Sequence, residues 1–94
     1  MSIVWLPSTL RDVRELRAYI SQSDPGAAAV VLSRIRASVE TPDQFPMLGR
    51  PGRGQRTREL AVPRTPYVVH YQIVEDSIEI VRVLHGAQQW PPTP

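Results

Sequence analysis

The stretch Tyr67-Val-Val-His-Tyr-Gln-Ile-Val-Glu-Asp-Ser-Ile-Glu-Ile-Val-Arg-Val-Leu84 decides the fold of this chain. Residues 67–74 are rich in branched and aromatic side chains, which is typical of a β-strand. The Glu-Asp-Ser at residues 75–77 indicates a tight turn, and residues 78–84 predict the last strand. The side chains predicted on one face of the first of these strands are Tyr67, Val69, Tyr71 and Ile73. On the last strand, Arg82 is predicted to interrupt a face shared by Ile78, Ile80 and Leu84.

The segment before this hairpin predicts a further strand and a loop. Residues 58–62, Arg-Glu-Leu-Ala-Val, alternate weakly in hydrophobicity and stop at Pro63, so we expect a third strand of an antiparallel meander. Residues 45–57 contain three of the five glycines and two prolines. We therefore predict a loop without regular structure there.

The first 40 residues predict a strand followed by two helices. Ser2–Leu6 is a short apolar run, and apolar residues then recur at helical spacing to about Gln22, with Ser8 or Thr9 as the expected N-cap. Asp24 and Pro25 open a second helix that ends at about Glu40. Its predicted core stripe is Ala28, Val31, Leu32, Ile35 and Val39, and a minor apolar strip is formed by Val30 and Ala37.

This element order predicts an α+β fold: an N-terminal strand, a two-helix hairpin and a three-stranded antiparallel meander. The hairpin is expected to pack on one face of a single sheet. Little of the chain is left to cover the opposite face. We expect that face to be bare and to carry the function, with Arg82 lining an open groove beside Arg58.

Composition bounds the class of protein. Ninety-four residues predict a single domain, residues 1–94, and the absence of cysteine excludes disulfides and thiolate chemistry. No apolar run approaches the roughly 18 residues of a membrane span. Because cysteine and a membrane span are both absent, we expect a cytoplasmic protein that binds no membrane. All eleven basic residues are arginine.

Several motifs along the chain resemble the ParE/RelE superfamily of type II toxin–antitoxin toxins, often labelled plasmid-stabilisation proteins. The resemblance covers essentially the whole chain. The matching pieces are the Trp5 strand, the helix Leu10–Ile20, Asp24-Pro25, Phe45-Pro-Met-Leu-Gly-Arg50, Thr57-Arg-Glu-Leu60, Tyr67–Tyr71 and Ile80-Val-Arg-Val-Leu-His-Gly-Ala-Gln-Gln-Trp90. The resemblance implies the RelE/ParE-like fold and a cognate antitoxin with a DNA-binding N-terminal domain, in a complex expected to be a heterotetramer.

The superfamily has two branches with different targets. The ParE branch inhibits DNA gyrase, with a ParD-like antitoxin, and is not known as a nuclease. The RelE branch cuts messenger RNA on the ribosome, using basic side chains and often a late tyrosine or histidine. We favour the ParE-like interpretation because the chain has no lysine and residues 87–94 contain no acid, tyrosine or histidine. No second titrating group is therefore evident near His85. The alternatives are a ribosome-dependent mRNA endoribonuclease and an inactive relative that only binds its antitoxin.

The candidate site residues follow from these readings. His85, with Arg82 and Arg58, would be catalytic in a nuclease, whereas the structural reading of Arg82 is a salt bridge to an acid such as Glu59. His70 is expected to be structural, and neither a metal site nor a cofactor is predicted. The predicted target-binding residues are Arg50, Arg53, Arg56, Arg58, Arg82, His85, Gln88 and Trp90.

The predicted antitoxin interface lies on the helical hairpin and continues towards the sheet. An acidic and apolar antitoxin segment is expected there, because Val30 and Ala37 form an apolar strip on the second helix and Arg14 and Arg17 lie on the first. The residues predicted to bind it are Leu10, Val13, Arg14, Arg17, Val30, Arg34 and Ala37.

Overall fold

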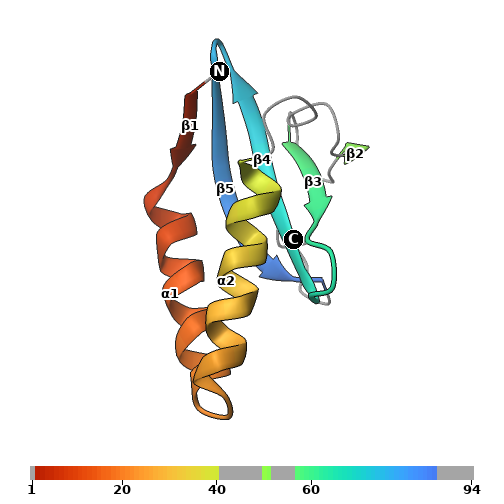
Figure 1. Ribbon diagram of the computed structural model, residues 1–94. Coiled ribbons are helices and arrows are strands. Elements are labelled where there is room, and N and C mark those ends of the chain that lie inside the picture. The colour runs from red at the N-terminus through yellow and green to blue at the C-terminus, as the bar shows by residue number, and fades with distance from the viewer. Residues whose placement is uncertain (1, 41–49, 52–56, 87–94) are drawn as a thin grey trace, which may run out of the picture.

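The computed structural model describes residues 2–40, 50–51 and 57–86. In these ranges the elements, in chain order, are β1 (Ser2–Trp5), α1 (Pro7–Ser21), α2 (Pro25–Val39), β2 (Arg50–Pro51), β3 (Thr57–Ala61), β4 (Tyr67–Val74) and β5 (Ser77–His85). The strands form one sheet in the order β1-β5-β4-β3-β2. The two helices lie side by side across one face of this sheet (Figure 1).

The predicted α+β fold is confirmed. The strands β3, β4 and β5 pair in an antiparallel meander, and β1 pairs with β5 in parallel at one edge, from Ser2 with Ser77 to Trp5 with Ile80. The parallel pairing requires a crossover between β1 and the sheet, and the helical hairpin begins that crossover. The hairpin thereby comes to cover the sheet.

The strand β2 corrects one prediction. Residues 45–57 were predicted to be a loop, but Arg50 and Pro51 pair with Glu59 and Arg58 of β3, and Thr57 begins β3. Because proline has no N–H, it is tolerated in an edge strand, where one side of the backbone needs no partner. The rest of the predicted loop lies outside the described residues.

The start of α1 also differs from the prediction. Neither Ser8 nor Thr9 caps the helix: both lie within it, the N-cap is Leu6, and Pro7 occupies the first turn. The Ser8 Oγ donates to the Val81 carbonyl at 2.7 Å, and the Thr9 Oγ1 donates to the Ile80 carbonyl. These hydroxyls therefore join the helix to β5.

The start of α2 is as predicted. Asp24 is the N-cap, and its Oδ1 accepts a hydrogen bond from the Ala27 backbone N–H at 3.1 Å. Pro25 fills the first helical position, where a missing N–H leaves no backbone bond unmade. Of the predicted core stripe, Ala28, Ile35 and Val39 are buried, and the remaining two side chains are half-buried.

An irregularity in the β4–β5 pairing changes which side chains of β5 face the helices. His70 pairs with Arg82 but Tyr71 pairs with Ile80, so Val81 is an extra residue on β5. After this bulge the alternation of side chains is shifted by one residue. The prediction that Ile78, Ile80 and Leu84 share one face with Arg82 was therefore wrong: Val83, not Leu84, joins the core cluster.

The core lies between the hairpin and the sheet. Tyr67, Val69 and Tyr71 are buried as predicted, but Ile73 is 36% exposed. The buried residues of the cluster are Leu16, Ile35, Val39, Leu60, Val62, Tyr67, Val69, Tyr71, Ile78, Ile80 and Val83. The fold therefore depends on the apolar faces of α1 and α2 being held against β4 and β5.

Side chains and backbone of the α1 region close the edge of β5 where β1 ends. The pairing of β1 with β5 stops at Ile80, whose carbonyl also accepts a bond from the Leu6 N–H at 3.3 Å. Farther along β5, the Asp12 Oδ2 accepts a hydrogen bond from the buried Val83 N–H at 3.0 Å. The helix thus supplies the hydrogen-bond partners that a longer edge strand would supply.

Replacing Asp12 with alanine should destabilise the fold by about 2–3 kcal/mol. The substitution leaves the Val83 N–H without its acceptor in a buried position, and removes the partner of Arg82. Urea unfolding followed by circular dichroism measures the change. The matched control is Glu15→Ala on the exposed part of the same helix, which should change stability by less than about 0.5 kcal/mol. Equal effects of the two substitutions would contradict this role of Asp12.

Candidate functional site

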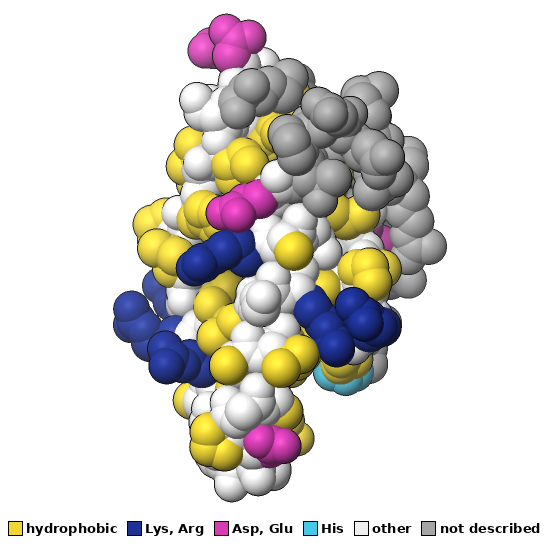
Figure 2. Space-filling model, in the orientation of Figure 1, with side chains coloured by type: hydrophobic (Ala, Val, Ile, Leu, Met, Phe, Trp, Pro, Cys, Tyr) yellow, Lys and Arg dark blue, Asp and Glu magenta, His cyan; other side chains and the backbone are white. Residues whose placement is uncertain are grey.

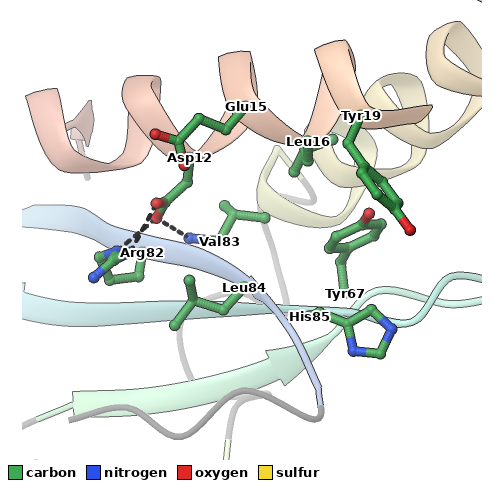
Figure 3. Close-up of a pocket in the computed structure, with 9 residues that line it drawn as sticks. All are labelled: Asp12, Glu15, Leu16, Tyr19, Tyr67, Arg82, Val83, Leu84 and His85. Carbon is green, nitrogen blue, oxygen red and sulfur yellow. Dashed lines mark hydrogen bonds and ion pairs between the residues drawn. The ribbon is translucent and has the colours of Figure 1, made fainter. Parts of the chain in front are cut away.

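A pocket of about 380 Å³ opens between α1 and the C-terminal end of β5 (Figure 3). Three apolar side chains, Leu16, Val83 and Leu84, form part of its wall. We call this hollow the β5-end pocket. Its other lining side chains are polar or aromatic: Asp12, Glu15, Tyr19, Tyr67, Arg82 and His85. The structure thus places the predicted residues Arg82 and His85 in one pocket.

Arg82 is held by a carboxylate on the helix. Its Nε donates to Asp12 Oδ2 at 2.7 Å and its Nη2 donates to Oδ1 at 2.9 Å. The Asp12 side chain is 6% exposed, whereas that of Arg82 is 32% exposed. The prediction of a structural salt bridge was correct in kind, but its suggested partner, Glu59, was wrong. The hydrogen bonds that Arg82 donates to Asp12 raise the pKa of Arg82, so this guanidinium is paired and permanently charged.

His85 lies beside two tyrosines. Its ring meets the ring of Tyr67 edge-on, with the centroids 5.9 Å apart, and Tyr67 pairs with His85 in the sheet register. Burial, and secondarily the nearby Tyr19, raise the pKa of Tyr67. The sequence indicated no second titrating group near His85, and this interpretation was wrong. Tyr67 lies on the neighbouring strand, and Glu15 and Tyr19 come from a helix that is distant in sequence.

A row of ionisable side chains crosses the sheet. Glu59, His70 and Arg82 occupy successive partner positions on β3, β4 and β5, and Arg82 continues the row to Asp12. The Nδ1 of His70 lies 3.9 Å from the Glu59 Oε1. Burial lowers the pKa of His70, although Glu59 acts in the opposite direction. The desolvation of a 6% exposed ring outweighs a carboxylate beyond hydrogen-bond distance.

The strand pairing and burial also correct the prediction that the sheet face opposite the helices is bare. His70 and Leu84 belong to the face opposite the helices, and both are only 6% exposed. Arg58 pairs with Tyr71, whereas Arg82 pairs with His70, so the two arginines lie on opposite faces. They do not form the predicted open groove lined by guanidinium groups.

A second hollow lies on the helical hairpin. It has a volume of about 570 Å³ and combines apolar side chains of α1, α2 and β1 with three arginines. The residues lining this hairpin groove are Trp5, Leu10, Val13, Arg14, Arg17, Leu32, Ile35, Arg36 and Glu40. A further hollow of about 410 Å³ shares Arg17, Leu32 and Arg36 with it, so the groove continues along the hairpin. Figure 2 shows arginine side chains among hydrophobic ones over the hairpin.

The groove brings together four of the seven predicted antitoxin-binding residues: Leu10, Val13, Arg14 and Arg17. Val30, 46% exposed, and Ala37, also exposed, do not line either hollow. Arg34 instead donates from its Nη1 to the Arg64 carbonyl at 3.1 Å. Arg36 and Trp5 also line the groove but were not predicted, although Arg36 follows Leu32 by four residues and so shares its side of the helix.

Five predicted target-binding residues have side chains that lie outside the part of the chain that the structure describes. The side chains of Arg50, Arg53, Arg56, Gln88 and Trp90 are outside the described residues, and only the backbone of Arg50 is placed, in β2. Within residues 2–40, 50–51 and 57–86, no cluster of three or more histidine or acidic side chains has the geometry to hold a metal ion. None of the described helices is both long and apolar enough to cross a bilayer.

The family model and the relatives that match this chain are all described as toxins or putative toxins. The family model for the ParE toxin of type II toxin–antitoxin systems, parDE, matches residues 3–90. The protein Y4kP of Sinorhizobium fredii is 45% identical over 89 residues, which are 95% of this chain and 92% of that protein. Toxin RelE2 of Caulobacter vibrioides is 30% identical over 92% of this chain and 96% of its own length.

A solved structure shares the fold. A chain of the chromosomal ParDE toxin–antitoxin system from P. aeruginosa superposes with a TM-score of 0.79, covering 90% of this chain and 95% of that chain. Its sequence identity is 23%. This likeness supports the α+β architecture described above.

The buried His70 should make the protein less stable in mild acid. The pKa of His70 is lowered in the folded state, so the unfolded chain takes up a proton first as the pH falls below its ordinary value of about 6.5. The contribution of His70 to the free energy of unfolding is therefore fully present above that pH. It is lost as the pH falls towards the folded-state pKa. Urea unfolding of the wild type and His70→Gln at pH 7.5 and pH 5.5 measures this, with a smaller loss expected in the variant. The same loss in both proteins would contradict the assignment.

Proposed function

Because the chain belongs to the ParE toxin family of type II toxin–antitoxin systems, we propose that it inhibits DNA gyrase by binding and is neutralised by a ParD-like antitoxin. The family match covers nearly the whole chain, so the toxin assignment applies to the complete described fold. The finer assignment of gyrase rests on the resemblance to the ParE branch. The protein is expected to act in the cytoplasm, as one component of a heterotetramer.

The hairpin groove is the observation that supports the antitoxin interface. Its apolar wall is flanked by Arg14, Arg17 and Arg36, and none of these three forms a salt bridge within the described part of the chain. With Glu40 as its one acidic lining residue, the groove still carries a net positive charge, and such an apolar hollow is complementary to a segment with both apolar and acidic side chains. We therefore propose that the antitoxin places such a segment along α1 and α2.

The charges around His85 support gyrase binding over RNA cleavage. The β5-end pocket contains the carboxylates of Asp12 and Glu15, and its one arginine, Arg82, is already paired with Asp12. These described side chains therefore carry a net negative charge, which disfavours a polyanionic RNA backbone at this position. A nuclease of this type needs cations that contact phosphate.

One observation favours the nuclease alternative. His85 and Tyr67 are in contact, and Glu15 lines the same pocket, so groups able to transfer protons do converge there. Such a constellation is the one expected for a ribosome-dependent mRNA endoribonuclease. An assay of both activities is required to separate the two functions.

Paired target assays should show inhibition of gyrase and no RNA cleavage. Protein freed of its antitoxin is added to gyrase with relaxed plasmid, and separately to ribosomes that carry a defined messenger. We expect loss of supercoiling and intact messenger, with addition of antitoxin restoring supercoiling. Cleavage of the messenger that His85→Ala abolishes would overturn the proposal in favour of the nuclease. No effect in either assay would favour the inactive relative that only binds antitoxin.

Charge reversal in the hairpin groove should weaken antitoxin binding. In Arg17→Glu with Arg36→Glu, two cations that would meet the acidic segment become repulsive, and we expect Kd to rise at least about tenfold. Isothermal titration with the purified antitoxin measures the change. The control is Arg11→Glu, an exposed position on α1 that does not line the groove. Unchanged binding in the double variant, or an equal loss in the control, would contradict the proposed interface.

A further inference from the structure

The hairpin groove and the hollow that continues it are lined by different kinds of side chain. The groove contains the apolar side chains of Trp5, Leu10 and Val13 at the end of the hairpin nearest β1. The second hollow, called the distal hollow below, lies towards the connection between the two helices. Its lining residues are Arg17, Ser21, Pro25, Ala29, Leu32, Ser33 and Arg36. The surface of the hairpin is therefore most apolar near β1 and changes to small and hydroxyl-bearing side chains near the connection.

Two arginines lie where these hollows meet. Arg17 of α1 and Arg36 of α2 line both the groove and the distal hollow, and both side chains are exposed. In the part of the chain that the structure describes, neither guanidinium forms a hydrogen bond or an ion pair. Arg14, one helical turn from Arg17, adds a third guanidinium to the groove. Like charges on neighbouring turns of a helix repel one another, so this junction favours a partner that supplies a carboxylate.

The acidic side chain of the groove lies on the β1 side of the junction. Glu40 follows Arg36 by one helical turn and lines the groove but not the distal hollow. Figure 2 shows an acidic side chain on the hairpin above the arginines, among hydrophobic side chains. Asp24, at the helix connection, lines neither hollow, and its Oδ1 accepts the Ala27 N–H. A carboxylate of a partner is therefore attracted to the junction and repelled near Glu40.

We propose that one acidic side chain of the antitoxin lies at the junction between Arg17 and Arg36, and that apolar side chains of the same segment contact Leu10 and Val13. This order of side chains rests on the proposed antitoxin interface, and it adds which part of the segment meets which part of the groove. A single carboxylate can accept from both guanidinium groups, because its two oxygens offer about four acceptor positions.

The length of the groove fixes the spacing of these antitoxin residues. Leu10 precedes Arg17 by seven helical residues, which is a rise of about 10 Å along α1. The acidic residue and the apolar residue of the antitoxin should therefore be about seven positions apart in a helical segment, or about three in an extended one. A second acidic residue at the apolar position is disfavoured by Glu40.

Double-mutant cycles between the two proteins test this arrangement. Each Asp and Glu of the antitoxin outside its DNA-binding domain is replaced by the corresponding amide. Isothermal titration then gives Kd against the wild-type toxin, Arg17→Gln and Arg36→Gln. We expect one antitoxin carboxylate to couple with both arginines. Its amide variant should weaken binding to the wild type about tenfold, but binding to either arginine variant by no more than about threefold.

Two toxin variants locate the coupled carboxylate. Arg11→Gln is the matched control, because Arg11 is exposed on α1 and lines neither hollow. Leu10→Ala probes the apolar end of the groove. The effect of the coupled carboxylate should be additive, within about twofold, with both substitutions. Leu10→Ala should couple instead with an apolar residue of the antitoxin. Circular dichroism of each variant checks that it is folded.

Two results would overturn the inference. One is that no antitoxin carboxylate couples with both Arg17 and Arg36, and the other is that the coupled carboxylate couples equally with Leu10. In both cases, weaker binding by the single toxin variants would leave the hairpin interface of the proposed function intact. If Arg17→Gln, Arg36→Gln and Leu10→Ala all leave Kd unchanged, the interface itself is wrong, and the order of side chains is wrong with it.

Discussion

The hydrogen bonding of one carboxylate, Asp12, is the constraint on which the arrangement of this molecule depends. It accepts the Val83 N–H of β5 and both guanidinium bonds of Arg82, and its side chain is 6% exposed. The Ser8 and Thr9 hydroxyls bond to the same strand one turn earlier. The helix is thereby fixed along the part of β5 that β1 leaves uncovered. Any displacement of α1 would leave buried polar groups without partners.

Fixing α1 in this way also fixes two surfaces of different charge. The hairpin groove carries Arg14, Arg17 and Arg36, and the β5-end pocket carries Asp12 and Glu15. Every basic residue of the chain is arginine, so the positive charges do not change with pH in the physiological range. His70 is buried beside Glu59 and away from both surfaces. Binding of charged partners is consequently set by geometry more than by protonation.

Local patterns in the sequence predicted the meander, the helical hairpin and half of the groove, because strand alternation, the Asp24 cap and helical spacing are properties of neighbouring residues. They did not predict the bulge at Val81, the partner of Arg82 or the pocket beside His85. The Arg82–Asp12 bond joins residues 70 positions apart, and no local signal records such a contact. The bulge exchanged Leu84 for Val83 in the core, which a strict two-residue period cannot show. The prediction of a bare sheet face was also wrong, because His70 and Leu84 are each only 6% exposed there, and a local pattern does not show what covers a face.

The parallel pairing of β1 with β5 has a consequence for synthesis of the toxin in the cell. Ser2 pairs with Ser77, so the sheet edge and the attachment of α1 form only when almost the whole described chain has left the ribosome. Contacts of such long sequence separation form late in folding. A nascent chain therefore lacks the completed β5-end pocket, whose lining includes residues 82–85. The hairpin groove is lined by residues between 5 and 40, so only the pocket has to wait for the translation of β5.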